Sequence, residues 1–133
     1  MKKVLLDTCA YSDLLRGTGD DVLEALDRCE AVLFSVIVLG ELHAGFRAGR
    51  HRQKNMETLH DFLAEDPVTI LPVTTETAEV FGEVKSALRK GGTPIPINDV
   101  WIAAQCLEHG AVLLTRDLHF RHVPGLRLGL THD

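Results

Sequence analysis

A short apolar run near the start of the chain ends abruptly at an acidic residue. Residues 4–6 are Val, Leu and Leu, and Asp7 follows them directly. A run this short and uniformly apolar is typical of a strand that is buried on both faces, as in a parallel sheet covered by helices. The run therefore predicts an α/β fold in which Asp7 stands at the carboxyl end of the first strand.

Further apolar runs alternate with helical patterns along the chain. Strands are predicted at residues 31–34, 68–71, 111–114 and, more weakly, 126–128. Helices are predicted from residues 18–20 to 29 and over residues 36–48, 52–64, 74–90 and 98–108. Ser35 and Asn98 are the predicted N-caps of two of these helices. Strands that alternate with helices favour a right-handed parallel α/β sheet.

Length and composition exclude several classes of protein. The chain has 133 residues, which predicts a single domain over residues 1–133. The net charge is −5, from 14 basic and 19 acidic residues, and this argues against a coat-like nucleic-acid binder. No apolar run approaches the roughly 20 residues that cross a bilayer, and no signal peptide is evident, so a cytoplasmic protein without a membrane segment is expected. Three widely spaced cysteines indicate neither a disulfide framework nor a zinc ribbon.

Four acids stand where a site is expected. Asp7 and Asp117 follow predicted strands, and ligands of open parallel sheets bind beyond the carboxyl ends of the strands. Glu41 lies within an apolar helix, where an acid is rarely buried unless it is paired or bound to metal. Asp99 opens the helix that follows a proline-containing loop.

Each acid also has an ordinary structural explanation. Asp7 could cap a helix, Asp117 could belong to a turn, Glu41 could reach solvent, and Asp99 could favour the helix dipole. If the four converge, however, they remain ionised together only around cations. Oxygen ligands without a Cys or His cluster select Mg²⁺ or Mn²⁺ over Zn²⁺, and such a site can activate water against a phosphodiester.

Four sequence blocks resemble the PIN-domain ribonucleases, and within them the VapC-type toxins of bacterial type II toxin–antitoxin pairs. The blocks are Val-Leu-Leu-Asp-Thr at 4–8, Ser-Val-Ile-Val-Leu-Gly-Glu-Leu at 35–42, Ile-Asn-Asp-Val-Trp-Ile-Ala-Ala at 97–104, and Leu-Leu-Thr-Arg-Asp at 113–117. The resemblance implies a three-layer α/β/α sandwich with a parallel sheet of four to five strands. It also implies an endoribonuclease that depends on Mg²⁺ or Mn²⁺. Such proteins are usually dimeric, form higher assemblies and are held inactive by a cognate, VapB-like antitoxin.

The resemblance assigns roles to five residues. Asp7, Glu41 and Asp99 match the three acids that carry the metal site, and Asp117 matches a fourth, more variable one. Thr115 matches a hydroxyl residue that orients Asp117 or a bound water. One residue departs from the pattern, because Cys9 stands where the family commonly has Asn or Ser. A buried, unreactive thiol is expected there, since no neighbouring base or cation lowers its pKa.

Basic residues gather in one stretch of this acidic chain. Residues 42–56 contain no Asp or Glu but include Arg47, Arg50, Arg52 and Lys54. These four residues are candidates for contacts with RNA phosphates, and a solvated junction between helices is the alternative. Arg116, beside Asp117, is a further candidate RNA contact.

Two other function classes stay open at this point. One is a PIN-like module that binds RNA or a protein partner without cleaving it. The other, less favoured, is a receiver-like regulatory domain in which Asp7 accepts a phosphoryl group; no lysine follows Lys90, although such a domain needs one near a late strand. The histidines show no metal-ligand spacing of the HExxH kind.

Overall fold

The computed structural model describes residues 2–130, so residues 1 and 131–133 of the predicted domain lie outside the described part. The elements follow one another as β1 (Lys3–Leu6), α1 (Thr8–Arg16), α2 (Asp20–Arg28), β2 (Ala31–Ser35), α3 (Val36–Ala48), α4 (Arg52–Leu63), β3 (Val68–Leu71), α5 (Thr75–Lys90), α6 (Ile97–His109), β4 (Val112–Leu114) and the 3₁₀-helix η1 (Leu118–His122).

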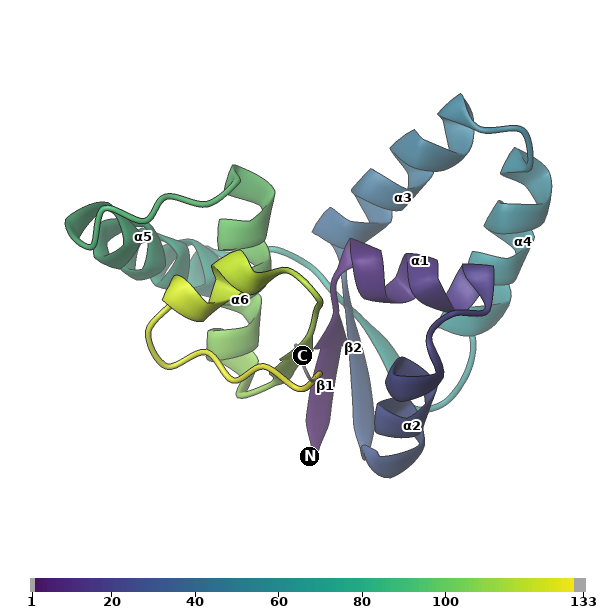
Figure 1. The fold of residues 1–133 in the computed structure, drawn as a ribbon, viewed down its shortest axis with the longest axis horizontal. Coiled ribbons are helices and arrows are strands. Elements are labelled where there is room, and N and C mark those ends of the chain that lie inside the picture. Colours follow the sequence, from purple (N-terminus) through teal and green to yellow (C-terminus); the bar gives the residue numbers. More distant parts are fainter. Residues whose placement is uncertain (1, 131–133) are drawn as a thin grey trace.

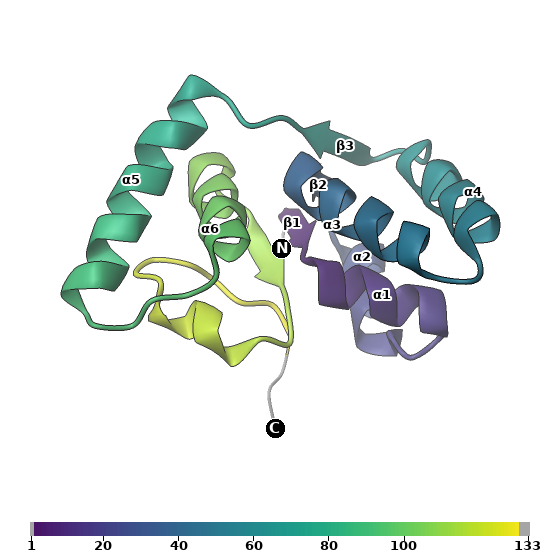
Figure 2. The same ribbon diagram turned by 90° about the horizontal axis from the view of Figure 1, so that it is seen from above.

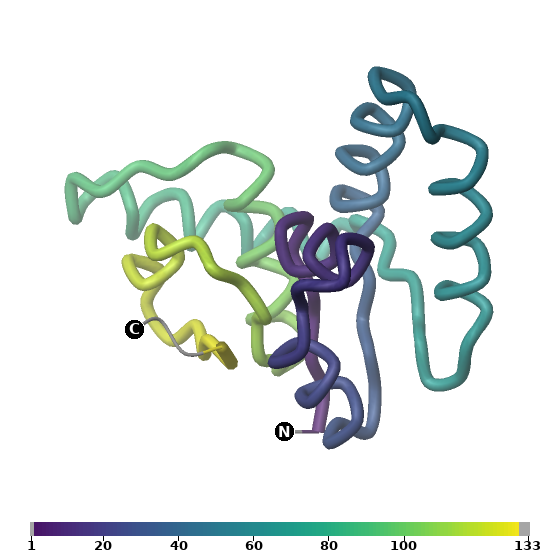
Figure 3. The backbone as a smooth tube through the Cα atoms, turned by 45° about the vertical axis from the view of Figure 1, so that its right-hand side comes forward, coloured from purple at the N-terminus to yellow at the C-terminus, as the bar shows by residue number. Residues whose placement is uncertain are grey.

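All four strands described within residues 2–130 are parallel and form one sheet in the order β3-β2-β1-β4. A receiver domain has the order 2-1-3-4-5, so the receiver-like alternative is wrong. Helices α5 and α6 lie on one side of the sheet and α1 to α4 lie on the other, which confirms the predicted α/β/α sandwich (Figure 2). Helices α3 and α4 form a hairpin that rises beyond the upper ends of β1 and β2 (Figures 1 and 3).

Strand β1 is part of the buried core, as the apolar run at residues 4–6 predicts. Val4, Leu5 and Leu6 are completely buried. On one face of the sheet, Tyr11 of α1 and Phe62 of α4 pack edge to face with Phe34 of β2, with ring centroids 5.3–5.7 Å apart. On the other face, Phe81 and Trp101 stack with centroids 3.9 Å apart and join α5 to α6. Both helical layers are thus held by aromatic contacts.

Two details of the prediction are wrong. The expected fifth strand at 126–128 is reduced to a single bridge between Leu128 and Leu113, because the chain leaves the sheet at once on either side. The last long helix begins at Ile97 with Pro96 as its N-cap, so Asn98 lies inside the first turn. Proline is tolerated here because the amide of an N-cap residue makes no hydrogen bond within the helix, so its absence costs nothing. No helix within residues 2–130 combines the length and the apolar character that a membrane span requires.

The strand register determines which side chains meet at the upper edge of the sheet. Leu6 pairs with Leu114, and the ladder continues one step further because the Asp7 amide donates to the Leu114 carbonyl at 3.2 Å. Asp7 and Thr115 therefore emerge from adjacent strands at the same level.

Candidate active site

Asp7 links the end of β1 to the start of α1. Its Oδ1 accepts a hydrogen bond from the Ala10 amide at 2.8 Å, which makes Asp7 the N-cap of α1. Its Oδ2 accepts a second hydrogen bond from the Thr115 hydroxyl. The residue is only 3% exposed. The capping role and a role in a site are therefore both possible for one carboxylate, since each oxygen retains a lone pair.

Thr115 connects two of the acids. Its buried hydroxyl donates to Asp7 and accepts a hydrogen bond from the Asp117 amide at 3.0 Å. One donor and one acceptor position are thereby satisfied, so the hydroxyl is fixed in orientation. This arrangement holds the loop after β4 against the end of β1.

Glu41 and Asp99 come from the two helical layers. Glu41, on α3, accepts a hydrogen bond from the Thr8 hydroxyl at 2.6 Å. Asp99, in the first turn of α6, lies 2.8 Å from His119 through its Oδ2 and the histidine Nε2. Thr8 and His119 thus orient two of the candidate acids.

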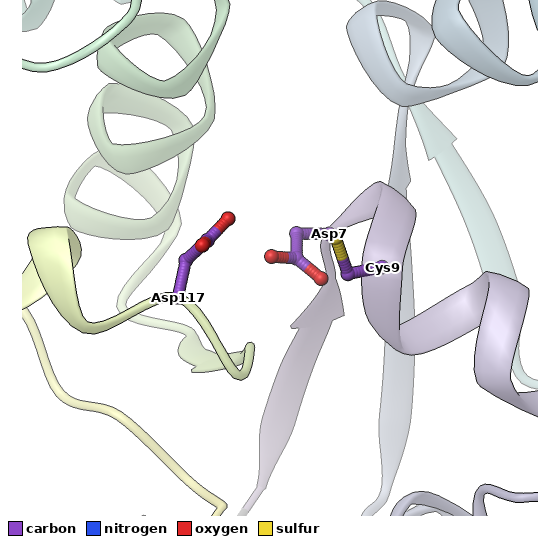
Figure 4. Close-up of side chains that lie close together, drawn as sticks. All are labelled: Asp7, Cys9 and Asp117. Atoms are coloured by element: carbon purple, nitrogen blue, oxygen red, sulfur yellow. The ribbon is translucent and has the colours of Figure 1, made fainter.

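The four candidate acids line a single cleft of about 360 Å³. They reach it from the end of β1, from α3, from α6 and from the loop that follows β4. In Figure 4 the carboxylates of Asp7 and Asp117 face each other across this space. Possible ligand atoms of Asp7, Cys9 and Asp117 lie within 4.8 Å of one another, as do those of Asp99, Asp117 and His119.

The electrostatics of the cleft favour a cation. Desolvation raises the pKa of Asp7 to about 6, although its hydrogen bonds from Thr115 and Ala10 act in the opposite direction. Nearby carboxylates add to this rise. Burial also raises the pKa of Asp99. His119 acts in the opposite direction, and Glu41 and Asp117 add to the rise.

No Lys or Arg of residues 2–130 lines the cleft. Its acids therefore repel one another, and the imidazole of His119 beside Asp99 offsets part of that repulsion. The donor set consists mainly of carboxylate oxygens, which suit a hard divalent ion such as Mg²⁺ or Mn²⁺. The residues present thus fit the metal that the sequence analysis expects.

Cys9 differs from the expectation. The thiol is exposed rather than buried, because Cys9, in the first turn of α1, lines the open acidic cleft. Partial desolvation and the adjacent Asp7 carboxylate raise its pKa, so the thiol stays protonated at neutral pH. The expectation of burial is wrong, and the expectation of low reactivity agrees with this environment.

The predicted basic residues lie apart from the acids. Arg47, Arg50, Arg52 and Lys54 are exposed around the turn between α3 and α4, and none of them lines the acidic cleft. Arg116 is close to the cleft in sequence but is held elsewhere. Its guanidinium forms ion pairs with Asp13 of α1 and Asp21 of α2, the latter bidentate at 2.7 and 2.9 Å.

His119, Thr8 and Asp13 are the interacting residues that the sequence analysis did not single out. His119 stands two positions after Asp117, in a stretch that also contains Arg116, Arg121 and His122. Its relation to Asp99 depends on how η1 packs against the start of α6, and no spacing rule reveals that packing.

Comparison with known proteins agrees with this geometry. The PIN domain family profile matches residues 4–126. Ribonuclease VapC2 of Haemophilus influenzae is 30% identical over 129 residues, which cover 96% of each chain. The tRNA(fMet)-specific endonuclease VapC of Salmonella typhimurium is 25% identical and covers 96% of this chain and 97% of its own length.

Solved structures show the same fold. The structure of DNA-bound VapBC from Salmonella typhimurium has a TM-score of 0.85 and 25% identity, and the match covers 96% of this chain and 97% of that chain. The structure of VapBC2 from Rickettsia felis bound to a promoter DNA fragment has a TM-score of 0.84 and 25% identity, with 95% and 96% covered. Since the profile spans nearly the whole chain and a full-length relative reaches 30% identity, this protein belongs to the PIN domain family.

Proposed function

We propose that this protein is a metal-dependent endoribonuclease and the toxin of a type II toxin–antitoxin pair. The observation that carries the proposal is the convergence of four carboxylates in one cleft beyond the carboxyl ends of β1 and β4. Relatives named as ribonucleases and solved VapBC complexes support the same activity and the same kind of partner.

In this proposal Asp7, Glu41, Asp99 and Asp117 hold Mg²⁺ or Mn²⁺. When bound, the ion activates water and offsets the charge that develops on a phosphodiester. The hydroxyl of Thr115 keeps the Asp7 carboxylate turned toward the cleft.

Several further assignments belong to the proposal. The partner is a VapB-like antitoxin, and the chain forms a homodimer that joins a larger toxin–antitoxin assembly. Residues 1–133 act as a single domain. The substrate is RNA, and the protein acts in the cytoplasm. The exposed residues Arg47, Arg50, Arg52 and Lys54 supply phosphate contacts that the acidic cleft itself lacks.

The test is cleavage of total cellular RNA by the purified chain, with mapping of the new 5′ ends. Asp7→Asn, Glu41→Gln and Asp99→Asn are each expected to abolish cleavage while the fold persists, because each removes a ligand charge and little volume. Asp117→Asn is expected to reduce cleavage less. The exposed Asp27→Asn on α2 is the matched control and stays active.

Metal removal is the second arm of this test. EDTA is expected to stop cleavage, and added Mg²⁺ or Mn²⁺ to restore it. Undiminished cleavage in EDTA contradicts the metal mechanism. A chain that binds RNA but cleaves nothing with either ion is instead the non-cleaving binding module.

A further inference from the structure

His119 lies beside the acidic cleft and offers a possible ligand atom of a different chemical kind, an imidazole nitrogen. It lies on η1, and its Nε2 stands 2.8 Å from Oδ2 of Asp99. The ligand atoms of Asp99, Asp117 and His119 all lie within 4.8 Å of one another. The imidazole is partly buried, with 30% of its side chain exposed, and its ring rests against Phe120 with centroids 4.8 Å apart.

The separation between His119 and Asp99 matches that between neighbouring ligands of one small ion. An octahedral ion with ligands at about 2.1 Å has neighbouring ligand atoms roughly 3 Å apart and opposite ones roughly 4.2 Å apart. The distance from Asp99 to His119 is close to the first value. An ion bound between the imidazole and Asp99 replaces their hydrogen bond, and it requires the tautomer of His119 whose proton lies on Nδ1.

We propose that His119 is a ligand of the divalent ion, beside Asp99 and Asp117, and that its nitrogen makes the site favour Mn²⁺ over Mg²⁺. The proposal rests on the proposed function, since it concerns the same cleft. Mg²⁺ strongly prefers oxygen donors, whereas imidazole suits transition metals. One nitrogen among carboxylates therefore shifts the selectivity of the site without changing the overall chemistry.

A purely positioning role for His119 makes a different prediction. If the ring only holds the Asp99 carboxylate by a hydrogen bond, its loss weakens Mg²⁺ and Mn²⁺ binding by the same factor. If the ring binds the ion, its loss weakens Mn²⁺ binding selectively. The ratio of the two dissociation constants separates these roles.

The experiment measures Mn²⁺ and Mg²⁺ binding to the metal-free full chain by calorimetry, with Mg²⁺ also measured by competition. His119→Gln is the test variant, because the amide retains a donor toward Asp99 and removes the imidazole. His122→Gln, an exposed histidine of the same 3₁₀-helix, is the matched control. His119→Gln is expected to weaken Mn²⁺ binding about tenfold, with Mg²⁺ binding changed less than about twofold. Equal weakening of both ions, or no change in either, overturns the proposal.

Spin-echo modulation of bound Mn²⁺ supplies a readout that is independent of affinity. Protein labelled with ¹⁵N-histidine is expected to show a directly coordinated nitrogen in the wild type and in His122→Gln, and none in His119→Gln. Bound Mn²⁺ without nitrogen modulation in the wild type refutes the role of His119 and leaves the proposed nuclease intact. Absence of any Mn²⁺ or Mg²⁺ binding contradicts the proposed function itself.

Discussion

At the scale of single residues, Asp7 combines a structural role with an electrostatic cost. Its carboxylate caps α1, yet desolvation raises its pKa from 3.8 to about 6. The folded chain therefore binds this proton more tightly than the unfolded chain does. The contribution of Asp7 to stability is fully present below about pH 4 and is lost as the pH rises through about 6.

We expect Asp7→Asn to stabilise the metal-free protein at pH 8. The pKa difference of 6 − 3.8, about 2 units, corresponds to about 3 kcal/mol at most. Asparagine keeps an oxygen for Ala10 or Thr115 and carries no charge. The measurement is urea unfolding in EDTA at pH 4.5, 6 and 8, where the stability gap between variant and wild type is expected to widen with pH. A gap that is independent of pH contradicts this account.

The Thr8 hydroxyl gives a second prediction at this scale. It holds Glu41 at 2.6 Å, and Thr8→Val removes that hydrogen bond with almost no change in volume. We expect cleavage to slow roughly tenfold, equivalent to about 1.4 kcal/mol, because the Glu41 carboxylate is no longer oriented. Thr58→Val, which affects only an exposed hydroxyl bonded within α4, serves as the control and is expected to retain full activity. Equal activity of the two variants removes Thr8 from the site.

At the scale of elements, Arg116 connects the loop after β4 to helices α1 and α2. Its guanidinium binds Asp13 of α1 and Asp21 of α2, and the ion pair with Asp13 lowers the pKa of that carboxyl. Because these ion pairs occupy the guanidinium, they favour a structural role over the predicted contact with RNA.

Arg116→Ala is therefore expected to reduce the free energy of unfolding by about 1 kcal/mol. The loss is this small because the ion pairs of Arg116 with Asp13 and Asp21 are partly exposed to solvent. The salt dependence of RNA binding is expected to stay unchanged. Arg121→Ala, at an exposed position on η1, is the control. Weaker RNA binding with unchanged stability supports the direct contact instead.

The turn between α3 and α4 carries the other cationic residues. Neutralising Arg47, Arg50, Arg52 and Lys54 to glutamine is expected to weaken RNA binding at low salt. The slope of log affinity against log salt should fall by roughly 0.7 for each RNA phosphate that the variant no longer neutralises. Filter binding across a salt series, done with the cleavage-deficient Glu41→Gln protein, measures this slope. An unchanged slope assigns this turn to solvent or to a protein partner.

At the scale of the whole molecule, the cleft presents unneutralised acids beside an apolar surface. Ile97 is 51% exposed and lines the cleft together with the four acids. An antitoxin tail that crosses the surface near α3 can bury apolar groups there. It can also place an arginine among the carboxylates, where the planar guanidinium pairs bidentately. Such a tail replaces the cation and blocks the RNA.

Competition with metal tests this form of inhibition. We expect a tail peptide from the cognate antitoxin to inhibit cleavage best at low Mg²⁺, and its advantage over a peptide with the basic residue changed to Ala to shrink as Mg²⁺ rises. The measurement is cleavage rate across a Mg²⁺ titration with each peptide. If both peptides inhibit equally at every concentration, the tail acts by bulk alone.

Local features of the sequence determined much of the architecture. The apolar run at 4–6 predicted a buried central strand, and β1 has that character. A helix was predicted over residues 74–90, where acids stand in the first turn, bases in the last turn and two glycines follow, and α5 spans Thr75–Lys90 with Thr74 as its cap. These predictions succeed because burial periodicity and capping act between residues that are near one another in the chain.

The meeting of distant groups was decided only by tertiary structure. Asp7 and Glu41 are 34 positions apart, and Asp99 is 58 positions further on, so their convergence depends on strand order and on the packing of α3 and α6 across the sheet. The same packing pairs His119 with Asp99 and removes Arg116 from the cleft. The separation of these residues along the sequence does not predict their contacts, because the contacts arise from three-dimensional burial rather than from local periodicity. The four candidate acids could thus be predicted from the sequence, whereas their convergence in one cleft depended on the fold.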